Sequence, residues 1–416
     1  MSFRNWPEAT GADGRTPFVA LGRPPTEIVI QQVEDIQLFL DIAGVTRVTV
    51  PAGEWRTKPL LVRRSGATLH LAAGASLLAE RGSLSSTANI IKLPRLADGR
   101  VARVTIEGEG PTSVIGFDDD EAYQGEHRHA IGVFNSDDVL IRTLRIQNTY
   151  GDGISVGTDD ETAPLLRRSR RVVIENVEID RASRNGVALV AAQDCVVRRV
   201  TITNVGPIAA GVAPTGPWAG IDVEPDESSQ PMSCVLEDVT VDGCDGSGIK
   251  VELANAACDQ DGYQMSLVVR RATVRNAGGA GLNVSNGFDY LHGSMTFEDC
   301  TVEGSGDAGI VVKDKALSGP SLSFARCSIT GANQGAGEHE NQAPIVVYKQ
   351  TEDLEYPRWR VQDGGVTLDV AVTGNELPDR VWVAGRSDGF EVHNVTGTVT
   401  GEGGIHVEHA TGVVLG

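Results

Sequence analysis

Residues 248–284 read GIKVELANAACDQDGYQMSLVVRRATVRNAGGAGLNV and begin and end on the same short phrase: Gly, an aliphatic residue, a variable residue, then Val or Leu. Within the phrase, apolar and variable residues alternate, which is the period of a β-strand. The phrase recurs at six glycines spaced by 33, 34, 28, 33 and 28 residues: Gly153, Gly186, Gly220, Gly248, Gly281 and Gly309. A unit of this length that cannot bury an apolar face alone must stack on its neighbours. The repeat therefore predicts a solenoid of short strands.

A second alternating phrase keeps step with the first, as in Val177-Glu-Ile, Val239-Thr-Val and Cys300-Thr-Val. Each unit then forms one coil of two or three strands, and coils stack at the ordinary strand spacing of about 4.8 Å. No unit has a helical period, so helical repeats are excluded. The fold class we predict is all-β, a parallel β-helix. The second phrase places Cys300 and Cys327 at one inward position of successive coils. Without a CxxC pair, the six cysteines are predicted to be buried free thiols.

Composition excludes several classes of function. The 416 residues carry 36 basic and 56 acidic side chains and a net charge of −20, which argues against a nucleic-acid partner. No stretch approaches the roughly 20 apolar residues of a membrane span. The first residues, MSFRNWPEATGADG, lack a signal pattern, so we expect a cytoplasmic protein or one secreted without a recognisable signal peptide.

One elongated domain over residues 1–416 is expected, in three parts. Residues 26–44 have the best helical pattern, with Thr26 as N-cap and Gly44 at the end, and this helix would cap the N-terminal end of the stack. Residues 48–350 hold the regular coils. Residues 351–416 are expected to form irregular C-terminal coils, because the phrases become looser there.

Residues 48–80, VTVPAGEWRTKPLLVRRSGATLHLAAGASLLAE, resemble the opening coils of polygalacturonases, and the later repeats resemble the pectin-lyase-like superfamily. The resemblance implies a right-handed β-helix and a polysaccharide substrate. The catalytic motifs of polygalacturonases are not matched. Asn148-Thr149-Tyr150 only approaches their Asn-Thr-Asp, Asp159-Asp160 stand in another context, and Gly-His-Gly and Arg-Ile-Lys are absent. Site residues must therefore come from the chain itself.

The variable residue of each phrase points outward, and stacking aligns these residues in columns. Strand geometry separates Asp222 from Glu224 by about 6.6 Å, Glu224 from Glu252 by about 4.8 Å, and Asp222 from Glu252 by roughly 8 Å. Carboxylate pairs at such separations suit glycoside hydrolysis, and their repulsion raises the pKa of one member. We therefore predict four catalytic residues in a groove on this face: Asp222, Glu224, Glu252 and Lys250.

A long loop between Val205 and Gly220 precedes the cluster, as functional loops often do. Its Trp218 is either a sugar platform or a hydrophobic anchor for the loop. Six residues around the cluster are predicted to bind substrate: Asp152, Arg184, Asn185, Trp218, Asn283 and Lys313. Further sugar platforms are Phe288, Tyr290 and Tyr348, whereas His127, His129 and the acidic run 118–120 are interpreted as turn residues. No metal site is predicted.

The leading hypothesis is a glycoside hydrolase that needs no cofactor and acts on an oligo- or polysaccharide. A polysaccharide lyase or uronate epimerase is the alternative, with Lys250 as base and Arg184 or a calcium ion neutralising the substrate carboxylate. A third hypothesis is a phage tail or adhesin-like rod that binds glycans without turnover. A monomer or a homotrimer fits these hypotheses.

Overall fold

The computed structural model describes residues 26–83, 85, 88–96, 99–117, 126–157, 168–207, 215–225, 232–254, 263–287, 291–333, 343–349, 363–385 and 391–416. The acidic run 118–120, the pair Asp159-Asp160, and Phe288 and Tyr290 lie outside these residues. So does Cys258. Among the described residues, no helix is long and apolar enough to cross a membrane.

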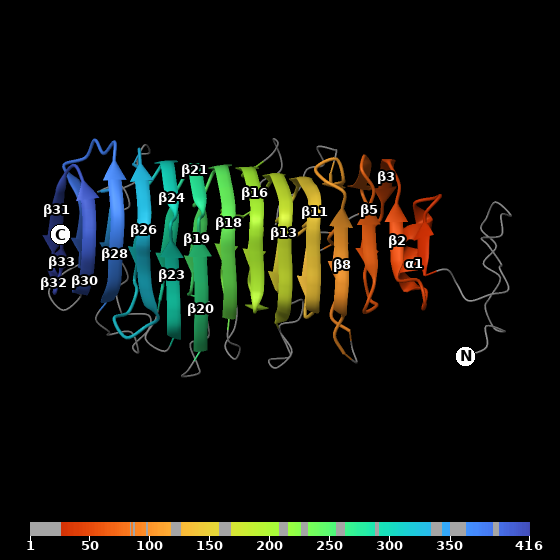
Figure 1. Ribbon diagram of the computed structural model, residues 1–416, viewed down its shortest axis with the longest axis horizontal. Helices are drawn as coiled ribbons and strands as arrows, with labels where there is room; N and C mark the ends of the chain where they lie inside the picture. The colour runs from red at the N-terminus through yellow and green to blue at the C-terminus, as the bar shows by residue number, and fades with distance from the viewer. Residues whose placement is uncertain are drawn as a thin grey trace.

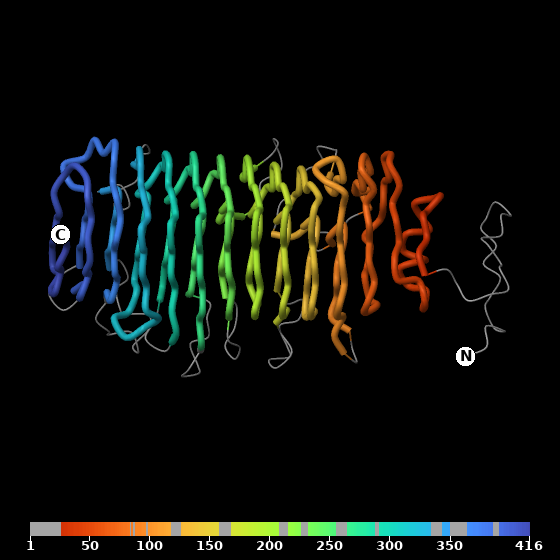
Figure 2. Tube along the Cα trace, viewed as in Figure 1, coloured from red at the N-terminus to blue at the C-terminus, as the bar shows by residue number. Residues whose placement is uncertain are grey.

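The strands stand side by side along the long axis of the molecule, from the N-terminal to the C-terminal end (Figure 1), and the chain trace repeats coil after coil (Figure 2). One sheet, the short-strand sheet, is built from the first phrase of each coil, and its strands pair in parallel in chain order. Its twelve strands within the described ranges are β4 (Leu60–Leu61), β7 (Ile91–Leu93), β10 (Ile131–Phe134), β12 (Ile154–Gly157), β14 (Val187–Leu189), β17 (Ile221–Val223), β19 (Ile249–Glu252), β22 (Leu282–Ser285), β25 (Ile310–Lys313), β27 (Ile345–Tyr348), β29 (Asp379–Ala384) and β31 (Gly404–Glu408).

The second phrase of each coil lies in the other sheet, the corner sheet, which is also parallel. Its described strands are β1 (Glu27–Val29), β2 (Arg47–Val50), β3 (Gly53–Thr57), β5 (Thr68–Leu71), β6 (Ala75–Ala79), β8 (Ala102–Gly108), β9 (Val114–Gly116), β11 (Asp137–Thr149), β13 (Ser169–Ala182), β15 (Ala192–Gln193), β16 (Cys195–Val205), β18 (Met232–Cys244), β20 (Tyr263–Arg270), β21 (Thr273–Ala277), β23 (Leu291–Glu298), β24 (Thr301–Ser305), β26 (Ser321–Thr330), β28 (Asp363–Thr373), β30 (Val392–Gly401), β32 (Ala410–Thr411) and β33 (Val414–Leu415).

The glycine that opens each first phrase lies where no side chain fits. A Cβ on Gly248 would come within 2.2 Å of Val274 Cγ1 and 2.7 Å of the Gly281 carbonyl oxygen. Gly220 meets Val241 in the same way, at 2.4 Å. Val241 and Val274 belong to the second phrase, so the two phrases keep step because the opening of one packs directly on an inward side chain of the other. The aliphatic residues of both phrases form one continuous core.

A column of residues with positive φ turns the chain at one corner of the coils, and from Arg199 onward its charges alternate. Its members are Asn176, Arg199, Asp238, Arg271, Asp299 and Arg326. Arg271 donates hydrogen bonds to both carboxylate oxygens of Asp238, at 2.7 and 3.1 Å. Because each basic residue pairs with an acid one coil away, the column favours the observed stacking order over a shifted one.

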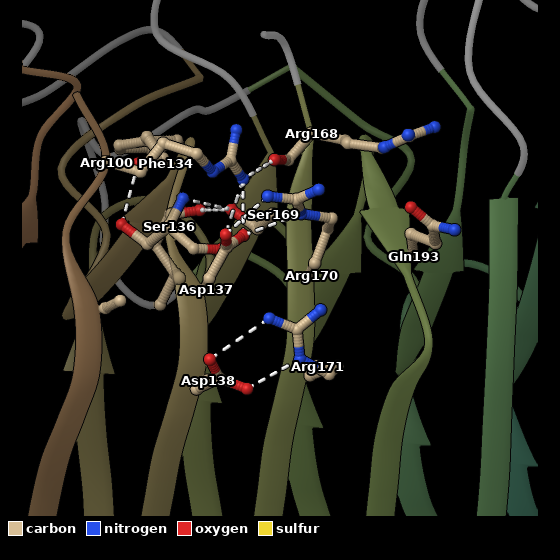
Figure 3. A network of polar contacts seen from close by, with 12 residues as sticks. Arg100, Phe134, Ser136, Asp137, Asp138, Arg168, Ser169, Arg170, Arg171 and Gln193 are labelled. Atoms are coloured by element: carbon tan, nitrogen blue, oxygen red, sulfur yellow. Dashed lines mark hydrogen bonds and ion pairs between the residues drawn. The ribbon is translucent and has the colours of Figure 1, made fainter.

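The same arrangement occurs nearer the N-terminal end, where Arg171 donates to both oxygens of Asp138 at 2.6 and 3.0 Å (Figure 3). Beside it, the Asp137 carboxylate accepts from Arg100 at 2.7 Å and from Arg170 at 2.9 and 2.6 Å. These contacts join neighbouring coils through their side chains, in addition to the backbone ladders.

The N-terminal helix is shorter than the predicted 26–44. Helix α1 spans Glu34–Asp41 with Val33 as N-cap, so the prediction of Thr26 as N-cap is wrong. Residues 27–29 instead form β1, which pairs with β2 and satisfies the backbone groups of that sheet edge. The helix lies at the N-terminal end of the stack (Figure 1), and its Ile36 and Leu40 are buried in the core.

The C-terminal coils are more regular than predicted. Residues 363–385 and 391–416 form β28 to β33, which continue both sheets in parallel pairing, with register shifts where β28 pairs with β26 and where β29 pairs with β31. The five described cysteines, at 195, 234, 244, 300 and 327, are buried and free, as predicted. Cys195 and Cys234 are register partners in β16 and β18.

Candidate functional site

The first column of outward residues on the short-strand sheet has the predicted order. Successive register partners are Ser155, Ala188, Asp222, Lys250, Asn283 and Val311. The aliphatic neighbours of these residues, such as Ile221 and Val251, lie in the core. Asp222 and Lys250 are therefore adjacent on the outer side of β17 and β19.

The second column is only partly as predicted. Glu252, Ser285 and Lys313 are register partners across β19, β22 and β25. Glu224 comes one residue after the end of β17, so it is not a ladder partner of Glu252. Its backbone N–H still bonds the Leu189 carbonyl at 3.1 Å, which holds this turn against β14.

Asp222 is fully buried, with a relative exposure of 0%, which differs from the prediction of a residue lining an open groove. One carboxyl oxygen, Oδ2, lies 3.5 Å from Nδ2 of Asn185. The other, Oδ1, is buried and accepts no hydrogen bond. Burial, reinforced by repulsion from Glu224, raises the pKa of Asp222 to about 8, although Lys250 and Arg184 act in the opposite direction.

Glu224 is half-buried beside Asp222. Burial raises its pKa too, while the Lys250 and Arg184 cations lower it, and a hydrogen bond from Asp222 favours the ionised Glu224. The two acids thus titrate as a coupled pair, in which a proton near neutral pH resides mainly on the more buried Asp222.

Glu252 is anchored from three directions. Its carboxylate accepts from Asn286 Nδ2 at 2.5 Å and from the Ala254 backbone N–H at 3.1 Å, and it lies 3.7 Å from the Lys250 ammonium. The Lys250 side chain keeps 22% of its surface exposed and the Glu252 side chain 17%. Both remain partly accessible next to the buried Asp222.

A rim column precedes the first phrases of the sheet, and it contains His129, Asp152 and Asn185. The coils meet here through backbone bonds such as that from Gly153 N–H to the Asn185 carbonyl, at 2.9 Å. Arg184 Nη1 lies 3.2 and 3.5 Å from the two oxygens of Asp152. Asp152 is 1% exposed, so its carboxylate is directed at protein groups.

The remaining predicted binding residues lie around this centre. Asn185 Oδ1 accepts the Ala219 N–H at 3.0 Å, which ties the end of the long loop to the rim. Trp218 is half-buried, and its backbone carbonyl accepts the Gly246 N–H at 3.0 Å. Asn283 bonds Ser247 and Ser285, and Lys313 is half-buried two coils beyond Glu252.

Sequence reasoning missed two residues here, His129 and Asn286. His129 is buried, and its Nδ1 accepts the Asp152 backbone N–H at 2.9 Å. Its position immediately before a first phrase, like those of Asp152 and Asn185, was a signal in the sequence. Asn286 gave no such signal, because it follows its strand.

No group of three or more His, Cys, Asp or Glu side chains is placed to hold a metal ion in the part of the chain that the structure describes. The cations that face the acids are those of Arg184 and Lys250. The arrangement can hold a proton on an acid near neutral pH and present a second, partly exposed carboxylate close by.

Residues 123–329 match the family model described as a right handed beta helix region. The structure is similar to the A-module of the mannuronan C-5 epimerase AlgE6 of Azotobacter vinelandii, with 13% identity, a TM-score of 0.61, and coverage of 94% of this chain and 97% of that one. It is also similar to a family 28 exopolygalacturonase of Yersinia enterocolitica, with 13% identity, a TM-score of 0.56, and coverage of 92% and 74%. No curated protein sequence matches the chain.

The structure is a right-handed parallel β-helix, the fold predicted from the repeat and implied by the resemblance. At such low identity the two structures show the fold alone.

Proposed function

We propose that the protein is a carbohydrate-active enzyme, and specifically a glycoside hydrolase whose acid is the Asp222–Glu224 pair. The observation that supports this most directly is the buried Asp222, whose pKa of about 8 keeps a proton in the site at neutral pH. A glycosidic oxygen must receive such a proton to leave, and a second carboxylate must activate water.

Asp222 and Glu224 differ in burial, and this difference assigns each of them a role in the proposed reaction. Asp222 has no exposed surface, whereas Glu224 is half-buried and is the member of the pair that reaches substrate. Glu224 passes the shared proton to the glycosidic oxygen, and the proton is restored from Asp222. Glu252, anchored by Asn286 and Lys250, accepts a proton from the water that attacks the anomeric carbon. Water is thereby added across the broken bond.

A lyase or epimerase reaction is the second candidate, because Lys250 lies directly beside Asp222 and could take the proton from C5 of a uronate. We favour hydrolysis, since the Lys250 ammonium is paired with Glu252 and Arg184 with Asp152. Lys250 is then not fully available as a base, and Arg184 is not fully available to neutralise a substrate carboxylate. The two similar structures are an epimerase and an exopolygalacturonase, so they fit both candidates.

The test is an assay of the full chain on neutral and uronic polysaccharides, with new reducing ends and unsaturated products measured separately. We expect reducing ends without unsaturation, and loss of at least about 100-fold in kcat for Glu224→Gln. The matched control is Glu303→Gln, since this exposed acid lies on the corner sheet. An unsaturated product would establish a lyase. Glycan binding without any turnover would instead support the rod-like binding protein.

A further inference from the structure

The rim carries a buried cluster that the proposed reaction does not use: His129, Asp152 and Arg184. Asp152 was predicted to bind substrate, but its carboxylate contacts Arg184 and lies 3.2 Å from Nδ1 of His129. With 1% exposure, it has no surface to offer a sugar. Because Asp152 lies near the acid pair, we consider a role in which it acts on that pair and not on the substrate.

Arg184 links Asp152 to the acid pair. Its Nη1 donates a hydrogen bond to Asp152 Oδ1 at 3.2 Å, and the positive charge of the guanidinium also attracts the Asp222 carboxylate. The Arg184 side chain is 12% exposed, its Nη2 lies 4.0 Å from Oε2 of the exposed Glu126, and its Nε is buried without a hydrogen-bond partner. The next residue, Asn185, contacts Asp222 itself at 3.5 Å. Residues 184 and 185 therefore join the coil of Asp152 to the coil of Asp222.

His129 fixes the position of Asp152. Its Nδ1 accepts the Asp152 backbone N–H, which leaves the ring proton on Nε2 of a neutral imidazole. Burial lowers the pKa of His129 to about 4, with Asp152 opposing and His127, Arg184 and Lys92 assisting, so the ring stays neutral at pH 7. This close approach needs Gly151, where a Cβ would be 2.9 Å from Nδ1 and 2.2 Å from the His127 carbonyl oxygen.

We propose that Asp152, held by His129, is a positioning residue that sets the protonation of the Asp222–Glu224 pair by dividing the charge of Arg184 between two carboxylates. The inference rests on the proposed function at one point only: the proposed hydrolysis is the reaction that would use the proton of the Asp222–Glu224 pair. The charged groups that face Asp222 are Glu224, Lys250, Arg184 and Asp152. Arg184 favours the ionised Asp222, and Asp152 opposes ionisation both directly and by holding the guanidinium.

Two substitutions then move the Asp222 titration in opposite directions. Asp152→Asn removes a repelling charge and releases Arg184, so the pKa of Asp222 falls. Arg184→Gln removes an attracting charge, so that pKa rises. A shift of about 1 pH unit is expected each way. Arg184→Lys keeps the charge and is expected to stay closer to the wild type. A merely structural role would not produce shifts of opposite sign.

The measurement is a carbon-13 NMR titration of the full chain labelled at the aspartate carboxyl carbons. The Asp222 signal is assigned by its loss in Asp222→Asn, and thermal unfolding checks that each variant folds. If Arg184→Gln does not fold, Arg184→Met preserves the packing of the side-chain stem and carries the same expectation. Shifts of the same sign, or no shift in either variant, would overturn the inference.

The titration needs no substrate, so it is independent of the proposed function. Opposite shifts in a protein that cleaves no glycan would support the coupling and reject the hydrolase. Hydrolysis that requires Glu224, together with an Asp222 titration that neither variant moves, would support the hydrolase and reject the coupling.

Discussion

Asp222 and Lys250 are register partners on adjacent coils, so a fully buried acid and a partly exposed ammonium stand side by side on one face of the β-helix. The cation lowers the pKa of both Asp222 and Glu224, against the larger effect of burial. The site therefore retains a proton near neutral pH although a cation adjoins it.

Removing this cation tests how the proton is held. Lys250→Met is expected to raise the pKa of Asp222 by about 1 unit, because an opposite charge at close range is lost. The alkaline limb of the pH–activity profile should move to higher pH while activity persists. Lys250→Arg, which keeps the charge, is the control. Complete loss of activity in Lys250→Met, with full activity in Glu224→Gln, would point to the lyase instead.

Burial of the Asp222 carboxyl should also lower the free energy of unfolding. The pKa of Asp222 is about 8 in the folded chain and near 3.8 when unfolded, so folded protein holds a proton that unfolded protein has released between these values. Stability therefore falls as pH rises from about 4 to about 8, and the deficit persists above. Asp222→Asn cannot ionise and is expected to be more stable than wild type at pH 9, by at most about 6 kcal/mol.

Urea unfolding at several pH values measures this difference. The gain should shrink as the pH falls and should vanish below about pH 3, where wild-type Asp222 is protonated in both states. An Asp222→Asn protein that is less stable than wild type at pH 9 would contradict the assignment.

The opening glycine of the first phrase should tolerate no side chain. Gly248→Ala places a methyl group 2.2 Å from Val274 Cγ1 and 2.7 Å from a carbonyl oxygen of the next coil. Overpacking of this kind costs about 1–3 kcal/mol or more. Gly99→Ala is the control, since a Cβ there meets nothing within 4 Å. Thermal unfolding of the two variants compares them, and an equal effect would refute the packing explanation of the repeat.

A buried lysine joins the C-terminal coils. Lys315, at 2% exposure, donates hydrogen bonds to the Ala316 and Gly364 carbonyls, each at 2.8 Å. Lys315→Met leaves both acceptors without this donor, so a loss of roughly 1–3 kcal/mol in the free energy of unfolding is expected. Lys313→Met, which changes a half-buried lysine two residues earlier, should cost clearly less. Denaturant unfolding gives both values, and a stability of Lys315→Met equal to that of wild type would show that the ammonium is dispensable.

The repeated phrase alone was enough to predict the solenoid and the order of the first column from Ser155 to Val311. Period-two alternation specifies which side chains point inward, and coils of nearly equal length can stack in only one register. The same local signals misjudged both ends. At residues 27–29, pairing with β2 outweighed helix propensity, and at 363–385 and 391–416 the strands continued both sheets although the phrases became looser.

Burial and contacts between distant residues were decided only by the tertiary structure. The sequence put Asp222 on an outward column, but its complete burial depends on the side chains and turns of other coils, among them Asn185 and the end of the loop at Ala219. Likewise, His129 and Asp152 are 23 residues apart, and they meet because one coil of the chain returns to the same rim. Strand periodicity determines the face on which a residue stands, whereas its pKa depends on the charges and the solvent exclusion that the stacked coils supply.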